Sequence, residues 1–404
     1  MPVTAHTTGP SPERPLLPLH RLEPPTPGPP RRTTFPNGTP VWLVTRYDDV
    51  RTVLSDPRMS RFLLTAPDAP PLTDTPNLLN RSDLLFNQDG EQHLQLRRTV
   101  QGVFTPRAVR RLRPWVADAI ERALDDLVAQ GPPVDLVDGY AGRLPLAVMN
   151  RLLGLEDLPD DQRRHWTAHA FANASRDADD VGLVLEEFAD FVAGLVAERR
   201  RAPGEDLISL IVRAADRSGD VPEGHVVHLI IGLMVGGHDS TATMLGNCLL
   251  FLLGERPDAW GRLGSDEAAA AALTERLLHL IPLGDSDGKL GNLRRATADI
   301  EIGGVRIRAG EVVAADQCAA GRDPAAYPDE PFADPFAPLP RPTLALGAGR
   351  HYCLGAWLAR TELRLALHRL AARLPGLRLT VPVADVEWRL GMISRSPLHL
   401  PATW

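Results

Sequence analysis

The chain has 404 residues, of which 44% are hydrophobic, so it can bury a large core. The length suggests two or three domains but also permits one large helical domain. The formal net charge of −7 argues against general nucleic-acid binding. Three cysteines, Cys248, Cys318 and Cys353, are too few for a disulfide framework and suit a reducing cytoplasm, where we expect the protein to reside.

The first 34 residues contain many prolines and lack the apolar core of a secretory signal. We expect residues 1–34 to form an extended or partly disordered arm and residues 35–404 to form a single domain. The longest apolar run, residues 226–253, carries two histidines and Asp239 near its middle. A membrane span tolerates such groups poorly, so this run predicts a buried helix and no membrane association.

In chain order, residues 35–40 predict a turn, residues 41–44 predict a strand, and a helix begins at Tyr47, where an Asp can cap it. Residues 64–88 are rich in Pro, Asp and Asn and predict a long loop. Apolar periodicity then predicts helices at residues 108–130, 160–175, 181–200, 226–253 and 267–281.

The last third of the chain mixes strand and turn signals. Alternation around a Gly-Gly pair predicts strands within residues 299–316, and a Pro-rich meander follows at 323–343. Residues 377–404 are mixed strand and turn. The expected fold class is therefore mainly α with small β-sheets.

Cys353 stands in a glycine-rich loop that runs directly into a helical pattern, Leu-Gly-Ala-Gly-Arg-His-Tyr-Cys-Leu-Gly, residues 346–355. Gly347 and Gly349 allow positive φ and a close approach of the backbone to a planar face, and Gly355 keeps the helix near the same face. Amides at the helix start lower the pKa of a nearby thiol. An isolated cysteine of this kind is more often a buried core residue.

This loop resembles the haem-ligand signature of the cytochrome P450 superfamily, and only Leu346 departs from it, where the family commonly has Phe. The resemblance runs from about Phe35 to the C-terminus and implies the cytochrome P450 fold and a haem b cofactor. It implies Cys353 as the iron ligand, and Leu346, Gly347, Gly349 and Gly355 as residues that contact the haem. A thiolate on haem iron favours O–O cleavage.

A second motif, Gly236-Gly237-His238-Asp239-Ser240-Thr241, lies within the long apolar run. Two glycines inside a helix cost about 1 kcal/mol each relative to Ala, and close approach to a cofactor would compensate. The string resembles the oxygen-activation motif of the same family. It implies that Gly236 and Gly237 contact the haem, that Asp239 relays protons, and that Ser240, where Thr is usual, and Thr241 complete the catalytic group.

The alternative for this motif is a kinked core helix with a solvated Asp239. His238 is interpreted as a packing or cavity residue. Ser240 keeps the hydroxyl of Thr but loses the methyl group that restricts its rotamer, so we expect looser proton delivery.

Four cationic side chains match the residues that hold haem propionates in the family: His93 and Arg97 on one helix face, Arg294, and His351 in the cysteine loop. Arginine suits carboxylates because it pairs with both oxygens. Taken singly, each of the four is more often a surface charge.

One family motif is missing. The family carries a Glu-x-x-Arg pair on the helix before Arg294, tied to an arginine of the meander, but here Arg276 and His279 occupy those positions and Glu275 is one residue out of register. Gly321 also stands where the family usually has Asn. These departures put the retention of haem in doubt. Our hypothesis is that the protein is a divergent member of the superfamily that still binds haem.

Arginines cluster around one helix and its exit, and two more bracket the cysteine: Arg97, Arg98, Arg107, Arg110, Arg111, Arg113, Arg350 and Arg360. In an acidic protein they predict a local positive face that steers an acidic partner. The resemblance makes that partner a ferredoxin, which a ferredoxin reductase supplies with electrons from NAD(P)H. A solvated basic helix is the alternative.

The resemblance implies a monooxygenase that activates O2 to hydroxylate, epoxidise or oxidatively couple a medium-sized organic substrate. A composition rich in Ala, Arg, Pro and Gly is similar to that of actinomycete proteins, whose haem-thiolate enzymes often tailor natural products. Two alternatives stay open: a catalytically weak haem protein that helps another enzyme, and a peroxide-driven or isomerising enzyme. We expect a monomer.

Overall fold

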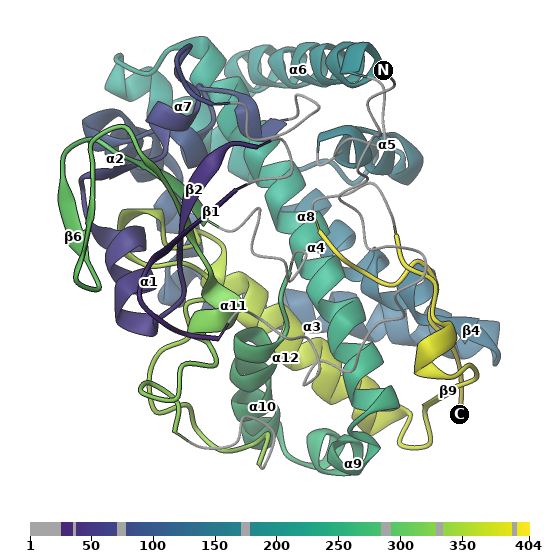
Figure 1. Ribbon diagram of the computed structural model, residues 1–404. Helices are drawn as coiled ribbons and strands as arrows, with labels where there is room; N and C mark the ends of the chain where they lie inside the picture. Colours follow the sequence, from purple (N-terminus) through teal and green to yellow (C-terminus); the bar gives the residue numbers. More distant parts are fainter. Residues whose placement is uncertain are drawn as a thin grey trace, which may run out of the picture.

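The computed structural model describes residues 26–34, 38–70, 78–170, 178–283, 292–328, 334–389 and 394–404. Helix α8 (Glu223–Gly254) crosses the middle of the molecule in Figure 1 and is buried along most of its length. It contacts α4 (Arg143–Leu153), α6 (Ala178–Arg201) and α12 (Ala356–Arg373), because apolar side chains surround it on all sides.

The remaining helices pack around this axis. They are α1 (Tyr47–Ser55), α2 (Gly90–Val100), α3 (Pro106–Gln130), α5 (Asp160–Ala170), α7 (Leu207–Ser218), α9 (Pro257–Ser265), α10 (Glu267–Leu280) and α11 (Gln317–Ala320). Among the described residues, no helix is both long enough and apolar enough to cross a membrane.

Strands form small sheets beside the helices (Figure 1). The largest sheet has the order β1-β2-β8-β5-β3, in which β2 and β8 are parallel and the other pairs are antiparallel. Its strands are β1 (Arg31–Thr34), β2 (Pro40–Val44), β3 (Met59–Ser60), β5 (Asn292–Ala296) and β8 (Val312–Ala315). A second sheet joins β4 (Val134–Asp135), β10 (Pro401–Thr403) and β9 (Arg378–Leu379), and β6 (Ile300–Ile302) pairs with β7 (Val305–Ile307).

The predicted fold class, mainly α with small β-sheets, is confirmed. The strand at 41–44, the long helix over 226–253 and the helix over 267–281 form close to their predicted bounds. The Gly-Gly turn also forms, with φ of 55° at Gly303 and 79° at Gly304, as a two-residue hairpin turn requires.

Two expectations need correction, and a third concerns a segment that the structure describes only in part. Residues 31–34, predicted as part of the arm, form β1 and pair with β2. Arg46 occupies the N-cap position of α1 and makes no side-chain cap, while Asp48 lies within the first turn and pairs with Arg341. The predicted loop at 64–88 contains short 3₁₀ turns, while residues 71–77, like residues 1–25, 35–37 and 171–177, lie outside the described residues.

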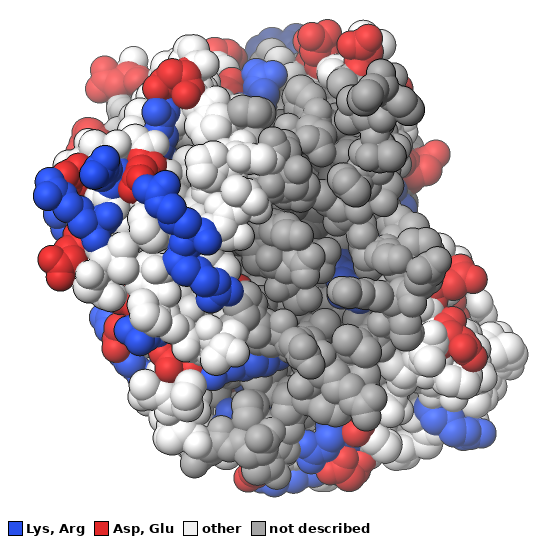
Figure 2. Space-filling view, in the orientation of Figure 1, with Lys and Arg blue, Asp and Glu red and all other residues white. Residues whose placement is uncertain are grey.

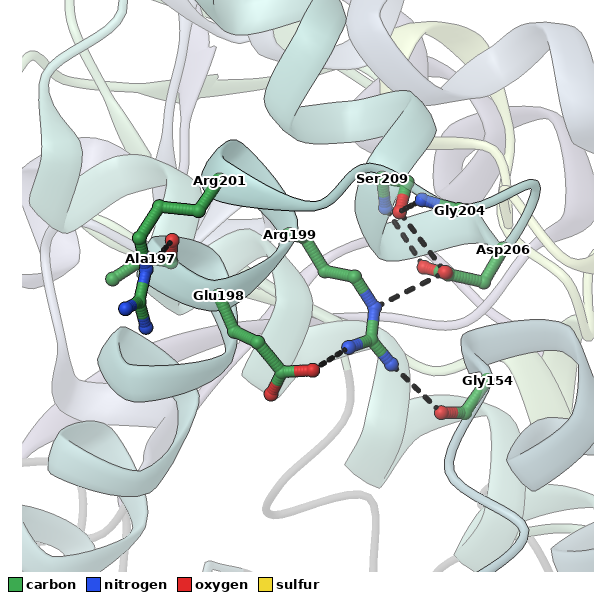
Figure 3. A network of polar contacts seen from close by, with 8 residues as sticks. All are labelled: Gly154, Ala197, Glu198, Arg199, Arg201, Gly204, Asp206 and Ser209. Atoms are coloured by element: carbon green, nitrogen blue, oxygen red, sulfur yellow. Dashed lines mark hydrogen bonds and ion pairs between the residues drawn. The ribbon is translucent and has the colours of Figure 1, made fainter.

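The turn between α6 and α7 is fixed to the end of α4 by one arginine (Figure 3). Arg199 donates to the Asp206 carboxylate at 3.1 Å and to the Gly154 carbonyl at 3.0 Å. Asp206 also caps α7, because it accepts from the Ser209 amide at 2.8 Å. This network sets the relative positions of three helices that pack against α8.

Candidate active site

Two glycines shape the loop that presents Cys353 at the start of α12. Gly347 and Gly349 have φ of 78° and 66°, in the left-handed region that favours glycine. The Cys353 amide donates to the Leu346 carbonyl at 2.8 Å and closes the loop. A Cβ at Gly349 would lie 2.7 Å from the Cα of Ser55, so this glycine also lets the loop pack against the end of α1.

The Cys353 thiol is partly buried among donors and cations. Burial raises its pKa, whereas the Gly355 amide and the guanidinium groups of Arg97 and Arg360 lower it. Coordination to a metal ion deprotonates such a thiol. A Cβ at Gly355 or at Gly236 of α8 would meet no described atom within 4 Å, so the backbone at both glycines borders open space.

Four basic side chains are buried close to one another. They are His93 in α2, Arg61 between β3 and α2, Arg294 in β5 and His351 in the cysteine loop. The rings of His93 and His351 lie 4.4 Å apart. Arg61 and Arg294 both donate to the Leu293 carbonyl, at 3.2 and 2.8 Å, and their charges repel. Burial lowers the pKa of Arg294 to about 10.

Asp89 is the acid that serves this cluster. It accepts from His351 Nε2 at 3.1 Å and from the Ser60 hydroxyl at 2.6 Å. Burial opposes ionisation of Asp89, but these hydrogen bonds outweigh it and hold the pKa of the carboxyl well below its usual range. Burial, together with the neighbouring His351 and Arg97, lowers the pKa of His93 to about 4.

Three nitrogens of the cluster are buried without a hydrogen-bond partner among the described residues: His93 Nδ1, Arg61 Nε and Arg294 Nε. Buried cations require anions, and Asp89 is the one carboxylate that the described residues place in this cluster, which is too few for the two guanidinium groups, while His93 Nδ1 also lacks a partner. The two propionates of a haem would supply the missing acceptors. The donor set therefore fits a haem whose iron would bind Cys353.

Arg97, the fourth predicted propionate residue, donates to the Tyr352 carbonyl at 2.7 Å. It thereby fixes the residue next to Cys353, and its contact with a propionate stays a prediction. Arg61 was missed by the sequence reasoning, because it lies in an irregular segment after β3 with no periodic signal; only its buried position beside Arg294 reveals it.

Asp239 is buried in α8, and both of its carboxylate oxygens are engaged. Arg389 donates to Oδ1 at 2.8 Å, and the Ser394 hydroxyl donates to Oδ2 at 2.7 Å. Arg389 also reaches Thr243, one turn further along α8, at 3.3 Å. The predicted proton-relay acid is thus bound to the C-terminal segment. The sequence analysis did not identify Arg389 and Ser394 as its partners, because they lie about 150 residues from Asp239 in the chain.

The neighbours of Asp239 face different surroundings, although α8 continues through them without a break. The Ser240 hydroxyl donates to the Gly236 carbonyl at 2.5 Å, one turn back, and Thr241 is buried. A Cβ at Gly237 would lie 2.5 Å from Sδ of Met149, so close packing of α4 on α8 accounts for this glycine. The catalytic roles of Ser240 and Thr241 and a haem contact of Gly237 stay predictions.

His238 lines a small cavity between α4, α5, α6 and α8, together with Asn150, Arg163 and Thr167. Apolar side chains form most of the cavity wall, these four residues add polar groups, and the cavity has room for about one water molecule. Burial lowers the pKa of His238 to about 4, so the ring is neutral at physiological pH. His238 is therefore a cavity residue, as expected.

Comparison with known proteins decides the family. The chain is 38% identical over 373 residues to nocardicin C N-oxygenase of Nocardia uniformis subsp. tsuyamanensis, which covers 92% of each chain. It is 36% identical over 375 residues to mycinamicin IV hydroxylase/epoxidase of Micromonospora griseorubida, again over 92% of each. The chain belongs to the cytochrome P450 family. The family model "Cytochrome P450" itself matches residues 288–374, which include the cysteine loop.

Solved cytochrome P450 structures share the fold. HinD, solved with NMFT and NO, aligns with a TM-score of 0.86 at 38% identity over 93% of each chain. The LnmA cytochrome P450 hydroxylase from the leinamycin biosynthetic pathway of Streptomyces atroolivaceus aligns with a TM-score of 0.83 at 36% identity, again over 93% of each. The expected cytochrome P450 fold is confirmed, and the protein is an oxygen-activating haem enzyme.

Proposed function

We propose that this cytochrome P450 hydroxylates, epoxidises or oxidatively couples a medium-sized, partly hydrophobic organic molecule in natural-product biosynthesis. The support is the range of its relatives, which the names describe as an N-oxygenase of nocardicin C and a hydroxylase/epoxidase of mycinamicin IV. A similar solved cytochrome P450, with a TM-score of 0.82, has biaryl coupling reactivity.

The cation cluster carries this proposal, since its unsatisfied donors fit the propionates of haem b. When bound, the haem supplies the activation of O2. Cys353 would hold the iron, and His93, Arg61, Arg294 and His351 would neutralise the propionates. Asp239 would hold a proton at its carboxylate, and the Ser240 hydroxyl would pass it onward, once each is released from its present partner.

The deciding experiment is the spectrum of the reduced protein under carbon monoxide, with a haem assay on the same sample. We expect the red-shifted Soret band of a thiolate ligand in the native protein and its loss in Cys353→Ser. A Cys248→Ser control should keep the band, because Cys248 is buried in α8 and contacts core side chains. A native protein without the band contradicts the proposal.

The proposed electron donor is a ferredoxin that a reductase reduces with NAD(P)H. Among the described residues, no ion pair engages Arg107, Arg110 or Arg111, all exposed on α3, whereas Arg98, Arg113 and Arg360 pair with carboxylates. Three free arginines on one helix suit an acidic partner.

Reduction by a ferredoxin should slow with rising salt and should slow several-fold when Arg110 and Arg111 become Gln. Arginines also gather over the sheet region around β1, β2 and β6, on the face shown in Figure 2. Arg31→Gln in β1, compared with Arg110→Gln alone, is therefore the charge-matched control. Equal effects of the two changes would remove α3 as the docking site.

Two further proposals concern the state of the protein. We propose a monomer in the cytoplasm, consistent with three free cysteines, and size-exclusion chromatography tests the oligomeric state. The alternative, a haem protein that only assists another enzyme, rests on the missing Glu-x-x-Arg pair. Oxygen uptake that depends on substrate is expected of the monooxygenase and not of a haem protein that only assists another enzyme.

A further inference from the structure

Helix α10 meets the meander without the family's charged pair. Arg276 and His279 stand at its two positions, and both are buried. The only arginine within residues 323–343 is Arg341. Arg341 pairs with Asp48 of α1 at 2.6 Å and lies over the Tyr47 ring, so it does not serve α10. Other contacts must therefore hold α10 against the meander and the cysteine loop.

His279 forms an aromatic contact where the family has a guanidinium. Its ring lies 4.2 Å from that of Tyr327, whose hydroxyl donates to the Pro342 carbonyl at 3.0 Å. A Cβ at Gly321 would lie only 3.2 Å from His279 Cε1. Glycine at 321 and histidine at 279, two separate departures from the family, therefore fit each other.

Arg276 makes a direct hydrogen bond to the meander. Its Nη2 donates to the Ala337 carbonyl at 3.1 Å. A glutamate at this position would turn an acceptor toward that carbonyl, and a buried carboxylate without a donor is costly. Position 276 has thus become a donor position.

Glu275, one residue out of the family register, connects α10 to the cysteine loop. Arg360 of α12 pairs with both of its oxygens, at 2.5 and 3.1 Å. The same guanidinium donates to the Tyr352 hydroxyl at 2.8 Å, and the Tyr352 carbonyl accepts from Arg97. Tyr352 precedes Cys353, so this chain of contacts ends at the thiolate ligand.

We propose that Glu275, Arg276, His279 and Gly321 form a replacement anchor, which holds the Cys353 loop without the Glu-x-x-Arg pair. Glu275 and Arg360 are its positioning residues for the thiolate. The proposal rests on the proposed haem-thiolate function and goes beyond it. Its consequence is that the native protein retains haem fully, and that restoring the family's residues weakens retention.

The first test compares Glu275→Gln with Glu267→Gln. Glu267 lies on the same helix and pairs with Arg113 and with Arg364 of α12, at 2.6 and 3.7 Å, but its described contacts do not include the cysteine loop. The readouts are the rate of haem transfer to apomyoglobin and the fraction of the carbon monoxide complex with a thiolate-type band. We expect about tenfold faster haem loss in Glu275→Gln, equivalent to about 1.4 kcal/mol. The control should stay near the native rate.

The second test restores the family residues. We expect the double variant Arg276→Glu/His279→Arg, and separately Gly321→Asn, to hold less haem per chain than the native protein. A gain in haem content in either would overturn the anchor. If these variants fail to fold, Glu275→Gln still decides, since it keeps the size and polarity of the side chain.

The outcomes separate the anchor from the proposed function. A native protein without the thiolate-type band overturns both. A native protein with the band, together with a Glu275→Gln variant that loses haem no faster than Glu267→Gln, overturns the anchor alone.

Discussion

At the residue scale, the acid of the predicted oxygen-activation motif is bound to a partner that the motif does not contain. Asp239 is 2% exposed, whereas the Arg389 side chain is 34% exposed, so the pair connects the buried helix with the surface. Ser394 completes the coordination of the carboxylate. The same contacts hold the C-terminal segment on α8.

Replacing Arg389 by Gln should destabilise the protein by about 2 kcal/mol, because a buried carboxylate loses its charged partner while Ser394 still donates to it. Urea unfolding of the native protein and the variant measures the change. Arg395→Gln is a suitable comparison within the same segment. A loss below about 0.5 kcal/mol in Arg389→Gln would show that the pair contributes little.

Gly349 allows a second prediction at this scale. Gly349→Ala should cost at least about 2 kcal/mol, since φ of 66° disfavours a side chain and the new Cβ would meet Ser55. The haem content of purified Gly349→Ala should fall with it. Gly38→Ala provides the control: its φ is 84°, but no described atom lies within 4 Å of the added carbon. Equal losses would mean that contact with α1 is unimportant.

At the element scale, glycine occupies positions within helices for different physical reasons. In α8, Gly237 accommodates Met149 of α4, while Gly236 faces open space. In α9, a Cβ at Gly264 would lie 2.7 Å from the backbone of Ala371 in α12. Packing explains Gly237 and Gly264 within the protein. Gly236 has no such explanation among the described residues, which is consistent with a cofactor beside it.

Replacing Gly236 or Gly264 by alanine should change the stability of the apoprotein in opposite directions. Without haem, Gly236→Ala should stabilise the protein by up to about 1 kcal/mol through helix propensity. Gly264→Ala should destabilise it by about 1–3 kcal/mol, because backbone atoms of α12 cannot move aside easily. Urea unfolding of both apoproteins tests this, and haem titration should show weaker binding in Gly236→Ala alone. Unchanged haem affinity there would contradict a haem contact of Gly236.

At the scale of the whole molecule, buried histidines make the apoprotein sensitive to acid. Burial lowers the pKa values of His93 and His279 to about 4, from an ordinary value of 6.5. Between these two values the unfolded chain binds protons that the folded chain does not bind. The free energy of unfolding therefore falls as the pH drops from 6.5 toward 4, and these groups cause no further loss below that.

We expect each of the two histidines to contribute up to about 3 kcal/mol to this loss. Urea unfolding of the apoprotein at several pH values within this window measures it. The haem-loaded protein should show a shallower slope, because propionates beside His93 favour its protonated form. The Asp89 carboxylate acts in a lower window: its stabilisation is lost only as the pH falls below its unfolded value of 3.8. A flat profile from neutral pH to about 5 would contradict the prediction.

The cysteine loop, the long apolar helix and the Gly-Gly hairpin were predictable from sequence, because local spacing and periodicity specify them. The cation cluster was predictable in part: His93, Arg294 and His351 follow from motifs, but Arg61 does not. Its segment has no repeating pattern, and only the sheet brings β3 beside β5.

The sequence by itself determined the family and the loss of the Glu-x-x-Arg pair, and it predicted Cys353 as the thiolate ligand, since each depends on residues close together in the chain. The tertiary structure decided what those residues touch. It placed Arg389 on Asp239, and it placed Gly321 against His279, so that two departures counted separately in the sequence became one contact. Such pairings arise from the packing of distant segments, and no local pattern encodes them.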